Sequence, residues 1–88
     1  MAFKIKKGLA YRKIDGVVFI VEAARERLHE LNAVGSLIWE CLAAGKSETR
    51  IADAVCAEFE VTAEEAQNDT GVFLKDLKNK GLLADEAK

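Results

Sequence analysis

The chain has 88 residues and a mass of 9.6 kDa, which suffices for one domain and is too little for two independent cores. Half of the residues are hydrophobic, but 14 of those are alanine, so the composition predicts a modest core without a deep, enclosed active site. The net charge of −2 disfavours a dedicated DNA-binding protein, because phosphate neutralisation supplies most of the affinity of such proteins.

The charge is unevenly distributed along the chain. Residues 1–27 carry seven Lys or Arg and three Asp or Glu, whereas residues 28–88 carry six and twelve. No apolar run approaches the roughly 18 residues of a membrane span, and the basic start of the chain leads into no signal-peptide core. The two cysteines form no CxxC pair. Together these features predict a cytoplasmic protein with reduced thiols.

Two short runs rich in β-branched and aromatic residues, 11–14 and 17–21, are separated only by Asp15 and Gly16. Asp-Gly between two such runs predicts a β-hairpin, because a type I′ turn requires positive φ at both central positions. The first two strands are therefore expected here.

A third strand is expected after a second turn. The polar stretch 23–27 predicts that turn, and residues 28–31 form a short strand after it. Alternation along this strand divides its side chains between two faces: His29 with Leu31, and Leu28 with Glu30. The resulting three-stranded antiparallel sheet has two edges, which must be protected or used.

From residue 32 the hydrophobic period changes from two to about 3.6, which predicts three helices. The predicted N-caps are Asn32, Ser47 and Thr62, and the predicted ends lie at Gly45, Glu60 and Gly81. The apolar stripes are Val34, Leu37, Ile38, Cys41 and Leu42, then Ile51, Ala54, Val55 and Phe59, then Ala66, Thr70, Phe73, Leu74 and Leu77.

Three strands followed by three helices indicate an α+β domain of winged-helix type. We expect a single domain over residues 1–88, with its ordered core at 9–83 and its strands confined to 9–32. Leu82 and Leu83 should cover the end of the core, and residues 84–88 should fray.

The sequence contains no recognisable catalytic set. His29 is the only histidine, and no Gly-rich phosphate-binding loop is present. A strand histidine held by hydrogen bonds is the expected state of His29. Cys41 and Cys56 lie in apolar helical patterns and are expected to be buried free thiols. We therefore predict a non-catalytic protein with no metal and no other cofactor.

Three residues depart from the helical patterns. Trp39 lies beside the stripe of the first helix, where it either widens the core face or stays partly exposed. Val72 lies off the stripe of the third helix, as a scattered surface residue or as part of a binding surface. Gly71 costs about 1 kcal/mol relative to alanine within that helix, so either another helix or a ligand side chain should approach it closely.

A set of residues spread over positions 31–83 resembles the pattern of a known family. It consists of Leu31-Asn32, Gly35, Ile38-Trp39, Gly45, Ile51, Phe59, Asp69, Phe73-Leu74, Leu77 and Gly81-Leu82-Leu83. In these positions the chain, from about residue 9 to 83, resembles the PqqD family. These small chaperone-like domains, also called precursor-peptide recognition elements, belong to pathways that modify ribosomally made peptides. Their three strands and three helices in a winged-helix arrangement agree with the fold predicted above.

The resemblance implies a function and a site. Such a domain binds the leader segment of a precursor peptide and presents it to a modifying enzyme, often a radical S-adenosylmethionine protein. The leader adds as a strand to the third strand and lies against the third helix. Carried onto this sequence, the peptide-binding edge is Leu28, His29, Glu30 and Leu31, and the helix wall is Asp69, Val72, Phe73 and Asp76.

Two positions depart from the family pattern. Thr70 stands where the family often has valine, and Gly71 is unusual inside that helix. We expect Gly71 to leave room beside Val72 for a leader side chain. The basic excess near the proposed edge, with Arg25 and Arg27, predicts an acidic leader residue at that end.

The alternatives are a DNA-binding winged helix and a homodimer formed through the open strand edge. In the first, the third helix would enter a major groove, but Glu64, Glu65 and Asp69 in its N-terminal half would repel phosphates. A peptide-binding module is therefore the leading hypothesis, with neither nucleic acid nor a membrane as its partner.

Overall fold

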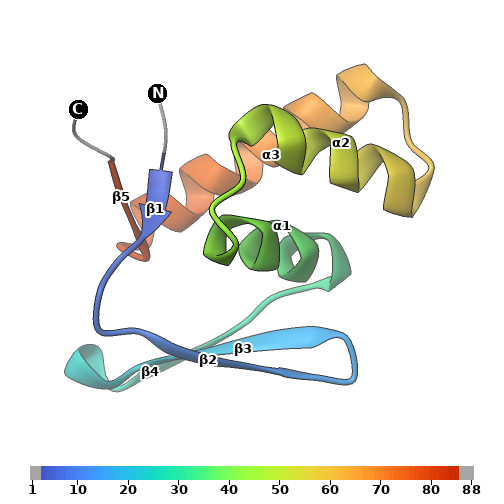
Figure 1. Cartoon of the computed structure of the whole chain (residues 1–88). Coiled ribbons are helices and arrows are strands. Elements are labelled where there is room, and N and C mark those ends of the chain that lie inside the picture. The colour runs from blue at the N-terminus through green and yellow to red at the C-terminus, as the bar shows by residue number, and fades with distance from the viewer. Residues whose placement is uncertain (1–2, 86–88) are drawn as a thin grey trace.

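The computed structural model describes residues 3–85, and within them the predicted three-stranded antiparallel sheet followed by three helices is confirmed. The strands are β1 (Phe3–Ile5), β2 (Ala10–Ile14), β3 (Val17–Glu22), β4 (Arg27–Glu30) and β5 (Leu83–Asp85), with a short 3₁₀ helix, η1 (Ala23–Arg25), before β4. The helices are α1 (Ala33–Ala43), α2 (Glu48–Phe59) and α3 (Ala63–Asn79). In Figure 1 all three helices lie on the same side of the β2–β3–β4 sheet, with α1 nearest to it.

The predicted β2–β3 hairpin is confirmed. Ile14 lies opposite Val17, and both turn residues have positive φ, 53° at Asp15 and 81° at Gly16. These angles are those of a type I′ turn, whose twist matches the twist of the two strands.

β4 is an edge strand of the sheet, as predicted. The sheet order is β2–β3–β4, and Leu28 lies opposite Val21 in the antiparallel pair. The amide of Leu31 donates to the carbonyl of Val18 at 3.0 Å. Since backbone groups alternate in direction along a strand, the N–H and C=O groups of Leu28 and Glu30 point to the open edge.

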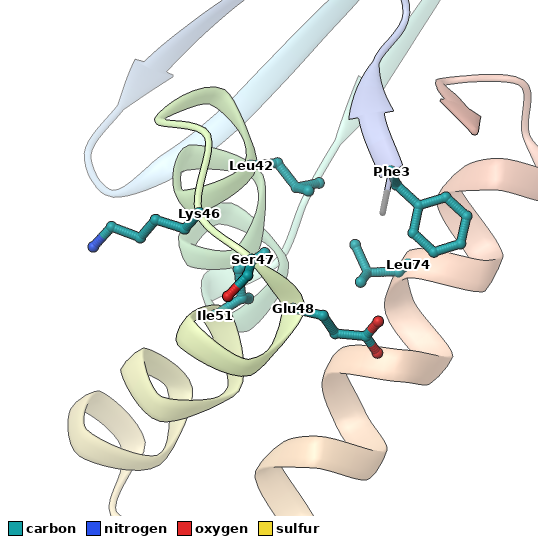
Figure 2. Close-up of a pocket in the computed structure, with 7 residues that line it drawn as sticks. All are labelled: Phe3, Leu42, Lys46, Ser47, Glu48, Ile51 and Leu74. Carbon is teal, nitrogen blue, oxygen red and sulfur yellow. The ribbon is translucent and has the colours of Figure 1, made fainter. Parts of the chain in front are cut away.

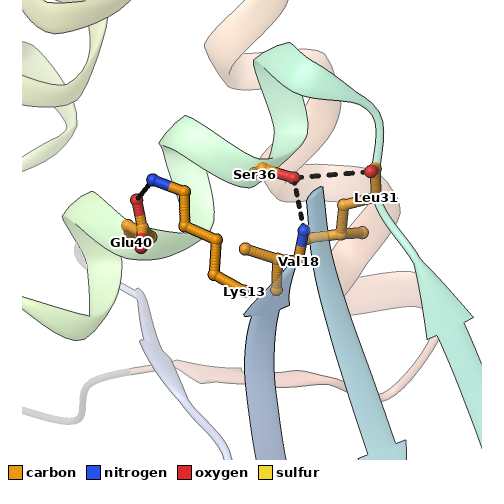
Figure 3. Close-up of polar contacts among 5 residues, drawn as sticks. All are labelled: Lys13, Val18, Leu31, Ser36 and Glu40. Atoms are coloured by element: carbon orange, nitrogen blue, oxygen red, sulfur yellow. Dashed lines mark hydrogen bonds and ion pairs between the residues drawn. The ribbon is translucent and has the colours of Figure 1, made fainter. Parts of the chain in front are cut away.

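A buried hydroxyl attaches α1 to the sheet at the point where β4 ends (Figure 3). The amide of Val18 donates to Ser36 Oγ at 2.8 Å, and that hydroxyl donates to the carbonyl of Leu31 at 3.4 Å. On the opposite edge, Lys13 Nζ forms an ion pair with Glu40 Oε1 at 3.0 Å. Polar contacts therefore link α1 both to Leu31, which follows β4, and to Lys13 of β2.

The three predicted N-caps are confirmed. The side chains of Asn32, Ser47 and Thr62 accept hydrogen bonds from the amides of Gly35, Arg50 and Glu65. All three helices end where predicted, with Glu60 in the left-handed conformation and with Gly45 and Gly81 at positive φ just beyond α1 and α3.

The core lies among the three helices and extends to the inner face of β3, where Val18 and Ile20 are buried. Trp39 is fully buried and so widens the core face of α1, one of the two predicted alternatives. The Tyr11 ring packs edge-on against Trp39, with ring centroids 5.6 Å apart. In α1 the buried face includes Gly35 and Ser36, whereas the predicted stripe residues Val34 and Leu37 are only half-buried. On this face Gly35 meets the Phe73 ring, and the Ser36 hydroxyl accepts from the amide of Val18 in the sheet.

The expectation that strands are confined to residues 9–32 is wrong. β1 and β5 form a second, two-stranded antiparallel sheet in which Ile5 lies opposite Leu83, and the ends of the described chain meet there (Figure 1). Leu82 and Leu83 are buried, as predicted. Residues 84 and 85 belong to β5 and were wrongly expected to fray, while 86–88 lie outside the described residues. No described helix combines the length and the apolar character that a membrane crossing requires.

Candidate functional site

An open cleft of about 470 Å³ lies between one face of α3 and the segment that follows β4. Its walls are formed by Asn32, Val34, Asn68, Asp69, Val72, Phe73 and Asp76. The structure thus places all four predicted α3 residues around one cleft, opposite the chain that leaves the β4 edge.

The centre of the α3 wall is apolar. Val72 is 62% exposed, a high value for a large apolar side chain, and the half-buried Phe73 lies beside it. Two carboxylates flank this centre, Asp69 and Asp76, of which Asp76 pairs with Lys80 at 3.2 Å. A ligand with one or two apolar side chains would bury Val72 and the accessible part of Phe73.

The Phe73 ring lies directly on the backbone of Gly35 in the first turn of α1. A Cβ atom at Gly35 would lie 2.5 Å from Phe73 Cζ, which is closer than any side chain permits. Glycine is therefore required for α1 and α3 to approach at this point. This role of Gly35 was not predicted, although a glycine in the first turn of a helix was a usable signal.

The four predicted β4 residues contribute differently from the α3 residues. Leu28 is 66% exposed and Glu30 is exposed, both on the outer face, whereas His29 is half-buried and Leu31 is buried. The side-chain faces are those predicted. The lining of the cleft contains none of these four side chains. What β4 offers next to the cleft is its unpaired backbone edge.

His29 takes part in a buried polar network, as expected of a strand histidine. Its Nε2 lies 3.2 Å from Glu22 Oε1, and Glu22 is only 5% exposed. The other oxygen of Glu22 pairs with Arg25 Nε at 3.1 Å. Arg25 Nη1 also donates to the carbonyl of Lys80 at 3.4 Å. Arg25 is thus engaged within the protein, whereas Arg27 is exposed.

Gly71 leaves room beside Val72, but outside the cleft. The two residues line a separate shallow depression with Gln67, Asn68 and Lys75. A Cβ atom at Gly71 would lie 3.7 Å from Glu48 Oε2 in the first turn of α2, which is an ordinary contact distance. Entry of a leader side chain into this depression stays a prediction.

A small cavity lies where β1, α2 and α3 meet, and it is too small for a ligand (Figure 2). It measures about 20 Å³, which is room for a single water molecule. Its lining residues are Phe3, Leu42, Lys46, Ser47, Glu48, Ile51 and Leu74.

Among the described residues, neither cysteine lies in a disulfide or in a cluster of potential metal ligands. Cys41 is buried, and the half-buried Cys56 donates from Sγ to the carbonyl of Val61 at 3.0 Å. Within residues 3–85, no three His, Cys, Asp or Glu side chains are grouped so that they could hold a metal ion.

Comparisons with known proteins agree with this geometry. Residues 17–83 match the family model described as coenzyme PQQ synthesis protein D (PqqD). The chain is 36% identical to TbiB1, solved in complex with the TbiA(beta) leader peptide, with a TM-score of 0.88 over 97% of this chain and 99% of that one. It shares its fold with lasso peptide synthetase B1, complexed with the leader peptide, at 21% identity and a TM-score of 0.86 over 97% and 100% of the two chains.

No curated protein sequence matches the chain. The family model nevertheless covers three quarters of it, and the resemblance drawn from the dispersed residues is confirmed. The chain belongs to the PqqD family.

Proposed function

We propose that this domain captures the leader segment of a ribosomally made precursor peptide and presents it to a modifying enzyme. The single observation that carries the proposal is the likeness to TbiB1, which extends over 97% of the chain and whose structure contains a leader peptide. The unpaired β4 edge beside a cleft with an apolar centre supports it.

In this proposal the leader adds to the sheet as a further strand. Its backbone pairs with the outward N–H and C=O groups of Leu28 and Glu30, and alternate side chains turn toward α3. The residues proposed to bind the peptide are Leu28, His29, Glu30 and Leu31 along the edge, and Asp69, Val72, Phe73 and Asp76 along the helix.

The α3 wall is needed for affinity. Ordering a flexible leader costs conformational entropy, so the backbone hydrogen bonds of a four-residue edge would give only weak binding. Burial of one or two apolar leader side chains on Val72 and Phe73 supplies the remainder. Sequence preference then arises at the cleft, because backbone pairing itself does not distinguish leader sequences.

Presentation requires no chemistry from this chain. PqqD-like proteins act as binding partners in the modification of ribosomal peptides, and we propose the same non-catalytic role here. Holding the leader beside an enzyme raises the local concentration of the attached core peptide, to about millimolar for a short linker. We propose that capture takes place in the cytoplasm, where the precursor peptide is translated. A radical S-adenosylmethionine enzyme as the partner remains a prediction of the family resemblance.

The DNA-binding alternative has less support. Glu64 and Glu65 are exposed in the first turn of α3, followed one turn later by Asp69. A recognition helix with these carboxylates in its N-terminal half would approach the phosphates with like charge.

The experiment is a fluorescence titration of the purified chain with labelled peptides. The probes are the TbiA(beta) leader and the N-terminal segments of short reading frames next to the gene of this chain. The tightest binder among them is called the leader probe below. The controls are its scrambled version and a mixed-sequence DNA duplex at low salt.

We expect saturable binding of one leader probe per chain and no comparable binding of the scrambled peptide. Equal binding of the leader probe and its scrambled version would contradict leader capture. Tighter binding of the duplex that weakens steeply with salt would favour the DNA-binding alternative instead.

A further inference from the structure

We infer that Arg25 is a positioning residue for leader recognition, because it ties the start of β4 to the end of α3 and thereby sets the width of the cleft between them. This inference rests on the proposed function. It adds the contact that holds β4 and α3 at a fixed distance from each other. Arg25 itself lies outside the residues that line the cleft.

Arg25 makes polar contacts with two parts of the protein. Its Nε lies 3.1 Å from Glu22 Oε2, and its Nη1 lies 3.4 Å from the carbonyl oxygen of Lys80. Glu22 is 5% exposed and is held from its other oxygen by His29 of β4. One guanidinium therefore connects the β3–β4 turn with the C-terminus of α3, 55 residues further along the chain.

The end of α3 is shaped to receive this side chain. Lys80 follows the last residue of α3, and carbonyl groups at a helix C-terminus lack helical partners and carry partial negative charge. Gly81, at φ +80°, comes next, and a Cβ atom there would lie only 2.8 Å from Arg25 Nη2. Gly81 thus serves the helix end and also leaves the space that the guanidinium occupies.

A second contact holds α3 at the other end of β4. There the Phe73 ring lies on Gly35, three residues after Asn32, which caps α1. Arg25 is two residues before the start of β4, and Gly35 is five residues after its end. The open edge and the cleft therefore lie between two points at which this side of the molecule is fastened to α3.

The Arg25–Lys80 and Phe73–Gly35 contacts should affect binding of the leader directly. A leader that pairs with β4 and also reaches Val72 must match the fixed distance between strand and helix. When that distance is set in advance, no binding energy is spent on ordering the two walls. Loosening the Arg25 contact should reduce the gain from the α3 wall and leave the backbone pairing at β4 in place.

The first test compares two glycines that share the same backbone demand. Gly45 and Gly81 both follow a helix, with φ +83° and +80°, but the Cβ position of Gly45 is open whereas that of Gly81 meets Arg25. Gly45→Ala and Gly81→Ala therefore carry similar backbone strain. We expect Gly81→Ala to weaken binding of the leader probe about tenfold, a typical size for the loss of a positioning contact, and Gly45→Ala to leave it unchanged.

The second test separates positioning from charge. Arg25→Lys keeps the positive charge but cannot donate from two nitrogens to Glu22 and the Lys80 carbonyl together. We expect it to weaken binding by about the same factor, with little dependence on salt, because no charge–charge contact with the peptide is lost. Val72→Ala should weaken binding clearly in the parent and much less in the Arg25→Lys background.

These measurements test the positioning role of Arg25 separately from leader capture. Parent-like binding by both Gly81→Ala and Arg25→Lys, or equal losses for Gly81→Ala and Gly45→Ala, would overturn the positioning role while leader capture by the parent stood. Additive effects of Arg25→Lys and Val72→Ala would also overturn it. Failure of the parent to bind any probe would instead refute the proposed function. Circular dichroism of each variant identifies those that fail to fold.

Discussion

The sheet has two open edges, β2 and β4, and they differ in what stands beside them. All five residues of β2 are exposed, and its charged Lys13 is tied to Glu40 of α1. β4 instead leads into a cleft whose far wall, on α3, has Val72 and Phe73 at its centre. Both edges offer unpaired backbone groups, and each has a hollow beside it. The hollow of about 350 Å³ beside β2 is lined by the charged Lys13, Glu40 and Glu58 among others, whereas the cleft beside β4 has an exposed apolar centre, so strand addition is expected at β4.

The largest loss of leader binding is expected from removing a backbone N–H donor at the open edge of β4. Glu30→Pro deletes an N–H group that points away from β3, so the existing sheet should persist while an added strand loses a partner. We expect leader binding to weaken about tenfold or more, since an unpaired buried carbonyl costs about 1–3 kcal/mol. The matched control, Glu30→Ala, keeps the N–H and should bind nearly like the parent. Equal losses for both variants in the titration would place the effect in the carboxylate.

The next effect concerns the α3 wall. Val72→Asp places a carboxylate in the apolar centre of the cleft, and its burial under a leader side chain should cost about 1–3 kcal/mol of binding free energy. Val72 is exposed in the free protein, so the fold should be unaffected. Lys75→Asp, one turn further along α3 and outside the cleft, is the control for added negative charge. Unchanged titration of Val72→Asp would show that the leader does not use this face of α3.

A smaller effect is expected on stability alone. Thr70 is fully buried, and its hydroxyl has no hydrogen-bond partner among the described residues. Thr70→Val, which restores the residue often found in the family, should raise the free energy of unfolding by about 1 kcal/mol. Leader binding should not change, because the Thr70 side chain faces the core. Lower stability in urea denaturation would contradict this, as would altered binding.

The smallest effect concerns charge at the start of β4. Arg27 is exposed, and Arg27→Gln should weaken binding of a leader with an acidic residue at that end by less than about 1 kcal/mol. The difference should vanish at high salt, because surface charges are screened. A loss that persists at 0.5 M salt, within a titration series, would point to a structural role for Arg27 instead.

The elements that could be predicted are those with local signals. The Asp15-Gly16 turn, the side-chain faces of β4 and the helix caps each follow from a few adjacent residues. β1 and β5 have three residues each and pair across almost the whole chain, so neither shows a period of its own. Their pairing is a tertiary contact that strand patterns do not reveal.

The same distinction between what the chain itself reveals and what depends on distant contacts applies to the candidate site. The family resemblance proposed Asp69, Val72, Phe73 and Asp76 as the helix wall, and the structure gathers them around one cleft. The roles of Gly35 and Gly81 depend on Phe73 and Arg25, which come from distant segments. The nearest residue to the Cβ position of Gly71 is likewise from a distant segment, Glu48 of α2, which the α3 pattern alone does not reveal.

The central claim is that a leader strand adds to β4 and not to β2, and amide hydrogen exchange followed by NMR tests it most directly. In β4 the outward amides are those of Leu28 and Glu30. In β2 they are those of Tyr11 and Lys13, because Ile14 and Val17 flank a two-residue turn and bond to each other.

On addition of the leader probe, the account predicts strong slowing of exchange at Leu28 and Glu30 and no change at Tyr11 and Lys13. The unbound chain, measured over a range of concentrations, shows whether a second copy occupies the β4 edge when no peptide is present. Protection at Tyr11 and Lys13, or saturating binding without protection at Leu28 and Glu30, would contradict strand addition at β4.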